Sequence, residues 1–382
     1  MKRICVILAA VLVICMLPVK TRAVELDTGA KSALLMDIAT GTVLYESNSH
    51  EPLAPASVTK VMTMLLIMEA IDSGKIGWND IVTASEAAAA KGGSQVYLKV
   101  GETMTVTDMV KSIAVSSAND CACAMAEHIA GSEGAFVDMM NARAKDLGMN
   151  DTHFVNCTGL DDDDSAREHR TSACDIALMS RELLKNHPDI TKFTTIWMDT
   201  VRDGAFGLSN TNKLIRFYPG ATGLKTGFTS GAGYCLSASA QRDGLGLIAV
   251  VMGCKTSQIR FSACKSMLDY GFANYALVTP DVEAAPEVPV KLGTEEAVKA
   301  VPAEKPQLLV EKSQKGSVTT EISLEEQICA PVSQGQRLGT MTVRAGEQIL
   351  TQVPLVAEKA VERLTWADLF VMMLRRVSMA KW

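Results

Sequence analysis

Ser57 and Lys60 place a hydroxyl and an amine three residues apart, a spacing that can generate a serine nucleophile. The residues that follow, 61–68, are apolar on nearly every face and predict a buried helix that begins at Ser57. Residues i and i+3 of a helix share a face, so the two side chains can form a hydrogen bond. If burial lowers the pKa of Lys60, its neutral amine can accept the serine proton. The structural alternative is an N-cap serine followed by a solvated lysine.

Ser117 and Asn119 are polar residues at a tight connection between two apolar segments. The segments 105–115 and 121–129 each have the length and apolar content of a buried helix. A polar turn between such helices must have its side chains hydrogen-bonded or used for function. Ser117 is therefore either the N-cap of the second helix or a functional hydroxyl.

Lys225, Thr226 and Gly227 lie on a predicted strand just before a predicted hairpin, 234–252, which is closed at Asp243-Gly244. A glycine in a strand removes a side chain, so that another backbone or a ligand can approach closely. The lysine supplies a positive charge and the threonine a hydroxyl donor. The alternative is a surface strand with an ordinary lysine.

Composition excludes several classes of function. The chain has 382 residues, 48% of them apolar and 21% charged, enough for two globular domains. A formal charge of −6 gives no basic surface for nucleic acid. The histidines lack zinc-site spacing, and the acidic run Asp161–Asp164 lacks the spacing of a calcium loop, so we expect a solvated loop there. We therefore expect no metal ion and no cofactor.

The N-terminus has the pattern of a secretory signal. Met1-Lys2-Arg3 is followed by an apolar run over residues 4–17, and Thr21-Arg22-Ala23 is an acceptable cleavage site. The run is shorter than a membrane-spanning helix requires. We expect residues 1–23 to be removed and the mature protein to be exported to the cell wall space, at the outer face of the cytoplasmic membrane.

Eight cysteines remain after removal of this segment. An even number in an exported protein is compatible with disulfides. The chain is large enough to fold without them, and several cysteines lie in apolar runs, so we favour buried free thiols. They are Cys121, Cys123, Cys157, Cys174, Cys235, Cys254, Cys264 and Cys329.

The three motifs occur in the order and approximate spacing of the active-site serine penicillin-recognising enzymes. The chain resembles the low-molecular-mass penicillin-binding proteins of the D-alanyl-D-alanine carboxypeptidase family, and most of all their sporulation-type members. Further segments that carry the resemblance are Leu53–Ser57, Gly93–Leu98, Asn150–Phe154, Thr158–Leu160, Thr171–Asp175 and Tyr218–Gly220.

The resemblance implies an α/β (α+β) catalytic domain of the β-lactamase and transpeptidase type over residues 24–277. Such a domain has an antiparallel sheet flanked by helices, plus a helical subdomain. The family also has a β-rich C-terminal domain, which we place at residues 278–360. Short alternating apolar runs within 286–357 predict the same small all-β domain.

The resemblance also implies residue roles. Ser57 would attack the carbonyl between the two terminal D-alanines of a peptidoglycan stem peptide, with Lys60 as its base. The backbone N–H groups of Ser57 and Phe228 would form the oxyanion hole. Ser117 would relay a proton to the departing D-alanine, and Asn119 would hold Lys60 and the substrate amide. Penicillins and other β-lactams would acylate the same serine.

The resemblance further implies that the Lys-Thr-Gly strand recognises the substrate carboxylate. Lys225 would set the electrostatics, Thr226 beside Gly227 would bind the carboxylate, and Arg260 would be a second carboxylate-binding residue. Some family members carry histidine at the position of Phe228 and glycine within the Ser-x-Asn motif. Both differences preserve the backbone contribution and therefore bear on substrate preference.

The last segment, 361–382, predicts an amphipathic helix in the membrane interface. It is too short and too charged to span a membrane. The alternative is a helix docked on its own protein. Its apolar face contains Trp366, Leu369, Phe370, Met373 and Val377, and its cations are Arg375, Arg376 and Lys381.

Two other functions compete with the carboxypeptidase. A class A β-lactamase would share the three motifs, but it needs a Glu-x-x-x-Asn element that holds the deacylating water, and we expect none between Asn119 and Lys225. A non-catalytic wall-binding scaffold would keep the fold without turnover. The presence of all the proposed catalytic side chains favours an enzyme.

Overall fold

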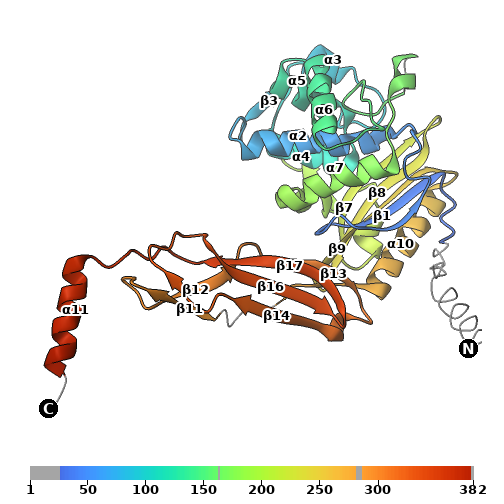
Figure 1. Ribbon diagram of the computed structural model, residues 1–382. Coiled ribbons are helices and arrows are strands. Elements are labelled where there is room, and N and C mark those ends of the chain that lie inside the picture. The colour runs from blue at the N-terminus through green and yellow to red at the C-terminus, as the bar shows by residue number, and fades with distance from the viewer. Residues whose placement is uncertain (1–25, 162–163, 281–285, 380–382) are drawn as a thin grey trace, which may run out of the picture.

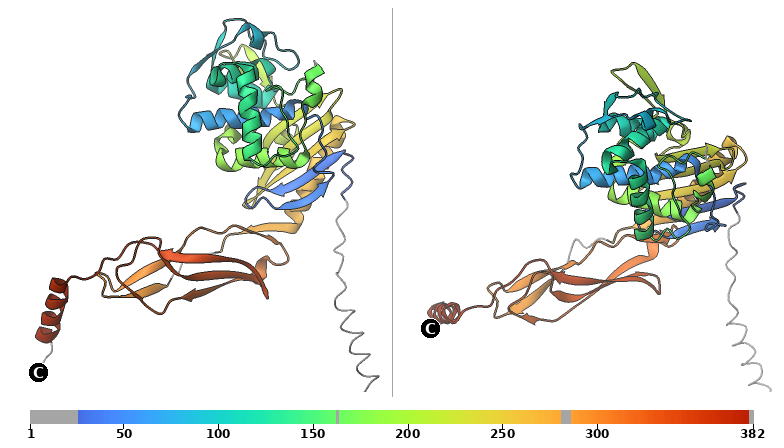
Figure 2. Two further views of the ribbon diagram at one scale, coloured as in Figure 1. Left: turned by 45° about the horizontal axis from the view of Figure 1, so that its top comes forward. Right: turned by 90° about the horizontal axis from the view of Figure 1, so that it is seen from above.

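The computed structural model of the chain describes residues 26–161, 164–280 and 286–379. These residues form two domains with separate hydrophobic cores, and the first domain contains all three motifs. Figures 1 and 2 show the second domain extending away from the first, with the C-terminal helix at its far end. The expected signal peptide, residues 1–23, lies outside the described residues.

A five-stranded antiparallel sheet in the order β2-β1-β9-β8-β7 forms the centre of the first domain. β1 and β9 are buried on both faces, which explains their nearly continuous apolar sequences. β7, which carries the Lys-Thr-Gly motif, is at one edge. The strands are β1 Ser32–Asp37, β2 Val43–Ser47, β7 Ala221–Thr229, β8 Gly233–Arg242 and β9 Leu245–Cys254.

Helices cover both faces of this sheet (Figure 1). α2 (Lys60–Asp72) and α7 (Ala173–Asn186) pack on one face, and α10 (Ser257–Asn274) packs on the other. Leu34 of β1 belongs to the core beneath α2, whereas its neighbour Leu35 belongs to the core beneath α10. Successive residues of a strand point to opposite faces, so one strand supplies both cores.

A helical subdomain beside α2 contains the Ser-x-Asn motif. α4 (Val106–Ser116) ends at Ser117, which has a left-handed backbone with φ of 66°, and α5 (Asn119–Ala130) begins two residues later. The chain therefore reverses between two buried helices within the motif itself. The subdomain also contains β3 Ile81–Thr83, α3 Glu86–Ala89, β4 Thr103–Thr105 and α6 Glu133–Asp146.

Short elements connect these units and shape the surroundings of the site. They are the 3-10 turns η1 Ala56–Thr59, η2 Asp164–Glu168 and η3 Pro188–Ile190, the helices α8 Thr191–Thr194 and α9 Leu214–Phe217, and the hairpin of β5 Met198–Val201 with β6 Phe206–Ser209.

Before its C-terminal helix, the described part of the second domain is made of strands and one 3-10 turn, η4 Lys315–Ser317. Its main sheet has the order β14-β16-β17-β12-β11-β15 around a core of its own, and β10 pairs with β13 where the two domains meet. It ends in the helix α11, Trp366–Met379. The strands are β10 Tyr275–Val278, β11 Glu287–Lys291, β12 Ala297–Pro302, β13 Leu308–Glu311, β14 Val318–Leu324, β15 Ile328–Cys329, β16 Arg337–Ala345 and β17 Gln348–Ala357.

The fold class expected from the sequence is confirmed, including the predicted hairpin 234–252, which is present as β8 and β9. The eight cysteines of the described residues are free thiols, and most of them are buried. No helix in the described part of the chain is both long enough and apolar enough to cross a membrane.

Candidate active site

Ser57 lies in a 3-10 turn rather than at the first position of the buried helix. The turn η1 spans Ala56–Thr59, and α2 begins at Lys60, so the expected start of the helix at Ser57 was wrong by one turn. Ser57 is partly exposed, whereas its neighbours on both sides are buried. The tighter turn still places residues i and i+3 on one side, because they eclipse each other in a 3-10 helix.

Lys60 is completely buried and faces Ser57. Its Nζ atom lies 3.0 Å from Ser57 Oγ and donates a second hydrogen bond of 2.8 Å to the carbonyl of Thr158. Burial lowers the pKa of Lys60 from 10.5 to about 7 because the charged amine loses its hydration. The alternative of a solvated lysine is therefore excluded, and the amine is able to act as a base near neutral pH.

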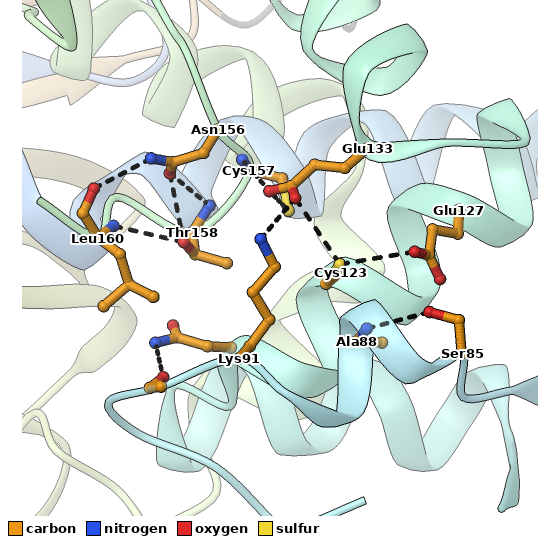
Figure 3. Close-up of polar contacts among 12 residues, drawn as sticks. Ser85, Ala88, Lys91, Cys123, Glu127, Glu133, Asn156, Cys157, Thr158 and Leu160 are labelled. Carbon is orange, nitrogen blue, oxygen red and sulfur yellow. Dashed lines mark hydrogen bonds and ion pairs between the residues drawn. The ribbon is translucent and has the colours of Figure 1, made fainter. Parts of the chain in front are cut away.

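The carbonyl that binds Lys60 belongs to a loop with its own hydrogen-bond network (Figure 3). Asn156 Oδ1 accepts the N–H and the hydroxyl of Thr158. It also accepts the N–H of Gly159 over 2.6 Å. Gly159 has φ of +81°, and a Cβ atom there would lie 1.8 Å from the carbonyl oxygen of Ala56. Only glycine allows this loop to pack directly against the nucleophile turn.

A buried thiol pair and an ion pair lie behind the same loop (Figure 3). Cys157 Sγ contacts Glu133 at 3.2 Å, Cys123 Sγ approaches the same carboxylate at 3.8 Å, and Lys91 forms a 2.6 Å ion pair with it. The Lys91 ammonium lowers the pKa of Glu133 although burial acts in the opposite direction. The carboxylate thus joins α6 to the loop that supports Lys60.

Ser117 and Asn119 contain buried polar atoms without a protein partner. Among the described residues, neither Ser117 Oγ nor Asn119 Oδ1 has a hydrogen bond. Ser117 is not the N-cap of α5, because Ala118 occupies that position. Buried unsatisfied atoms are costly, and a role in catalysis or in ligand binding is one reason why a protein retains them. The strained left-handed backbone of Ser117 supports the same interpretation.

The hydrogen bonds of Asn119 differ from one expectation. Its Nδ2 donates to the carbonyl of Gly92 over 2.7 Å, and its backbone N–H donates to the carbonyl of Ser94. The expected contact that holds Lys60 is absent from the described hydrogen bonds, since the amine binds Ser57 and Thr158 instead. Two carbonyls of one loop thus fix Asn119.

The Lys-Thr-Gly strand packs directly on the nucleophile turn. A Cβ atom on Gly227 would lie 2.6 Å from the carbonyl oxygen of Pro55 and 3.1 Å from the backbone nitrogen of Val58. The expected role of this glycine, close approach of another backbone, is thus present. Lys225 is buried, and burial together with the nearby charges of Lys60 and Arg260 holds its pKa well below its usual range.

The remaining predicted residues surround the same strand. Thr226 shares a hydrogen bond of 2.6 Å with the hydroxyl of Thr211, and Phe228 is 53% exposed and packs on Tyr234 with the two rings tilted by 30°. Arg260 extends from α10 and donates to the carbonyl of Gly227 over 3.0 Å. Its guanidinium therefore contacts the backbone of the strand, while its Nε is buried without a partner among the described residues.

Sequence reasoning assigned no role to the residues that support the site. Thr158 acts through its backbone carbonyl, and Gly159 acts because it has no side chain. Neither feature can be recognised from the residue types in the sequence. Asp120 is completely buried and accepts the N–H groups of Val96 and Leu98. An acidic residue inside an apolar helix was the one signal that could have identified it.

One expectation about the competing β-lactamase was wrong. A Glu-x-x-x-Asn element does occur between Asn119 and Lys225, at Glu182 and Asn186 on α7. Glu182 is bound to Arg143, which also binds Glu69. Glu69 lies nine residues beyond Lys60 on α2, or about 13 Å along the helix. The Glu182 element is thus structural, because its contacts through Arg143 place it near the end of α2 that is far from Lys60.

Comparison with known proteins gives matches in both domains. Residues 19–256 match the family D-alanyl-D-alanine carboxypeptidase, and residues 278–363 match the family Penicillin-binding protein 5, C-terminal domain. The D-alanyl-D-alanine carboxypeptidase DacF of Bacillus subtilis (strain 168) is 44% identical over 348 residues, which are 90% of this chain and 88% of that protein.

Solved structures agree with these matches. Penicillin binding protein 5 from Haemophilus influenzae has a TM-score of 0.74 at 28% identity, and the match covers 89% of this chain and 99% of that one. Penicillin-Binding Protein D2 from Listeria monocytogenes, in its ampicillin-bound form, has a TM-score of 0.60 at 31% identity over 65% of this chain and all of that one (100%).

Proposed function

Because the chain belongs to the D-alanyl-D-alanine carboxypeptidase family and its activity is that of a serine D-Ala-D-Ala carboxypeptidase, we propose that Ser57 is the nucleophile and Lys60 its general base. The observation that carries these roles is the 3.0 Å contact between the hydroxyl and a completely buried amine. The proposed substrate is the pentapeptide stem of peptidoglycan, which ends in two D-alanines.

In the proposed acylation, neutral Lys60 accepts the proton of Ser57 as Oγ attacks the carbonyl carbon between the two D-alanines. The backbone N–H groups of Ser57 and Phe228 stabilise the oxyanion. The close packing of Gly227 on the turn supports this pairing, because it brings the backbone of β7 next to Ser57. Collapse of the intermediate breaks the peptide bond and leaves an ester on Ser57.

We assign the two unsatisfied atoms of the Ser-x-Asn motif to protonation of the leaving group and to binding of the substrate. Ser117 Oγ donates a proton to the departing D-alanine amine and regains one from Lys60. Asn119 Oδ1 accepts the N–H of a substrate amide, which would satisfy this buried atom. Water then hydrolyses the ester and releases the shortened peptide.

Lys225, Thr226 and Arg260 are proposed to select a free C-terminal carboxylate. Two cationic side chains and a hydroxyl gather on β7 and α10. A bound carboxylate would offset the lost hydration of the buried Lys225 and its repulsion by the guanidinium of Arg260. A substrate with an amidated C-terminus should therefore be cleaved far more slowly than the free acid.

Mass spectrometry of the protein after incubation with a penicillin tests the nucleophile. We expect a single covalent adduct on the Ser57 peptide and release of D-alanine from a pentapeptide analogue. Ser57→Ala should form no adduct, while Ser116→Ala, with its hydroxyl bound to its own helix at 3.0 Å, is the matched control and should behave as wild type. An adduct on another residue would overturn the assignment.

The same experiment separates the competing functions. A wall-binding scaffold would form no adduct and release no D-alanine. A β-lactamase would lose the adduct within seconds. Glu182 of α7 shares Arg143 with Glu69, which lies nine residues beyond Lys60 on α2, and this position supports slow deacylation by water and hence a lasting penicillin adduct.

We further propose export of the mature chain and attachment to a membrane surface through α11. Trp366 is 89% exposed and Phe370 is 64% exposed on this helix, at the far end of the β domain (Figure 2). Exposed apolar residues on an amphipathic helix favour the lipid interface. The chain ending at residue 365 should fail to sediment with vesicles containing anionic phospholipid, whereas the chain that includes α11 should sediment with them.

A further inference from the structure

His169 is a buried histidine that the proposed mechanism does not use. It follows η2, and its side chain is only 3% exposed. Its ring meets Phe154 edge-on with centroids 5.6 Å apart. A buried polar ring needs hydrogen-bond partners, and the identity of those partners suggests what the ring does.

The hydrogen bonds of His169 define its tautomer and run in one direction. The amide N–H of Val155 lies 3.1 Å from Nδ1, and since a backbone amide can only donate, Nδ1 is the acceptor. The neutral ring then carries its proton on Nε2, which lies 2.8 Å from Thr59 Oγ1. Thr59 in turn donates to the carbonyl of Ala56 over 2.8 Å. These four groups form one chain of donors and acceptors.

This series of hydrogen bonds ends at the two residues that precede the proposed nucleophile and its base. Ala56 precedes Ser57 and Thr59 precedes Lys60. Ala56 has φ of 48°, a left-handed conformation that a residue with a Cβ atom adopts only where its surroundings hold it. The bond from Thr59 to the Ala56 carbonyl is one such restraint, and His169 fixes the direction of the Thr59 hydroxyl.

We propose that His169 is a positioning residue for acylation, whose Nε2–H keeps the Thr59 hydroxyl on the Ala56 carbonyl and thereby holds Ser57 in place against Lys60. This inference rests on the proposed function, because it assigns His169 to the same reaction. The ring touches neither Ser57 nor the Lys-Thr-Gly strand among the described contacts. Its loss should therefore lower kcat and leave KM nearly unchanged.

Two substitutions separate the two nitrogens of the ring. His169→Asn offers an acceptor near the Nδ1 position and is too short to reach Thr59. His169→Gln places its amide nitrogen near the Nε2 position and can donate to Thr59. A small misplacement of reacting groups costs up to about a hundredfold in rate, so we expect His169→Asn to acylate with penicillin about ten- to a hundredfold more slowly. His169→Gln should recover most of this loss.

Substitution of Thr59 tests the same hydrogen bond, between Thr59 and His169, at its acceptor. Thr59→Val removes the hydroxyl at nearly constant volume, and Thr59→Ser keeps it. We expect Thr59→Val to be as slow as His169→Asn, Thr59→Ser to be close to wild type, and the double variant His169→Asn with Thr59→Val to show no further loss. Groups that act through one contact are non-additive in this way.

Three results would overturn the inference while the proposed function stands: wild-type kcat in His169→Asn, equal losses in the Asn and Gln variants, or additive losses in the double variant. If His169→Asn does not fold, the comparison of Thr59→Val with Thr59→Ser decides the question alone. A wild-type protein that forms no penicillin adduct and releases no D-alanine would instead overturn the proposed function.

Discussion

The Nζ atom of Lys60 lies 3.0 Å from the Oγ atom of Ser57, and the lysine side chain is completely buried. Both conditions are needed for a lysine to act as a base at neutral pH. Proximity provides the path for the proton, and burial keeps the amine uncharged in part of the molecules.

This relationship predicts how the rate of acylation depends on pH. The pKa of Lys60 is about 7, so the penicillin acylation rate should fall about tenfold for each pH unit below it, as the amine becomes charged. Lys60→Arg should abolish acylation, because a guanidinium does not lose its proton. Lys75→Arg, on the exposed loop after α2, is the control. A rate that stays constant from pH 5 to pH 8 would contradict this role.

The same lysine affects folding stability in a defined direction. Its pKa is 10.5 when unfolded and about 7 when folded, so between these values the unfolded chain holds the proton that the native state lacks. The free energy of unfolding should therefore rise with pH across this window. Urea unfolding of wild type and Lys60→Met at several pH values measures the effect, and the Met variant should show a smaller slope.

Ser117 should show opposite effects on activity and stability. Its hydroxyl is buried without a described partner, so Ser117→Ala removes an unsatisfied group and should leave the thermal midpoint unchanged or slightly higher. Release of D-alanine should nevertheless fall by about a hundredfold or more, because a positioned proton donor is lost. A variant with normal activity would show that the hydroxyl takes no part in the reaction.

Gly227 is predicted to be intolerant of any side chain. The Cβ atom of Gly227→Ala would lie 2.6 Å from the Pro55 carbonyl, so β7 and the nucleophile turn must separate. We expect a loss of about 2 kcal/mol or more in stability together with slow acylation. Gly207→Ala is the matched strand control, because nothing lies within 4 Å of its added Cβ atom. Equal behaviour of the two variants would refute this account.

The cysteines should all be reactive once the protein is unfolded. The described structure has eight free thiols, of which Cys329 is exposed. A thiol reagent should modify Cys329 first in the native protein and all eight in guanidinium chloride without reductant. Burial raises the pKa of Cys264 well above its usual range, which further slows its reaction. Fewer than eight thiols in the denatured protein would indicate a disulfide.

The sequence by itself determined the chemical groups and their order along the chain. Ser57 and Lys60 are three residues apart, so a single helical turn places them on one side of the chain. The hairpin 234–252 and the two helices around Ser117 likewise follow from local patterns. Local spacing was less reliable for the helix start, because the strained turn at Ala56 depends on contacts with a distant loop.

Only the tertiary structure decided what surrounds these groups. Lys60 has a lowered pKa because the fold buries it completely, and the carbonyl of Thr158, 98 residues further along the sequence, accepts a hydrogen bond from its amine. Asn119 binds Gly92 rather than Lys60, and Glu182 is held through Arg143 near the end of α2 that is far from Lys60, for reasons that no local pattern contains. Burial and long-range hydrogen bonds are properties of the packed chain, and they turn a common sequence motif into an active site.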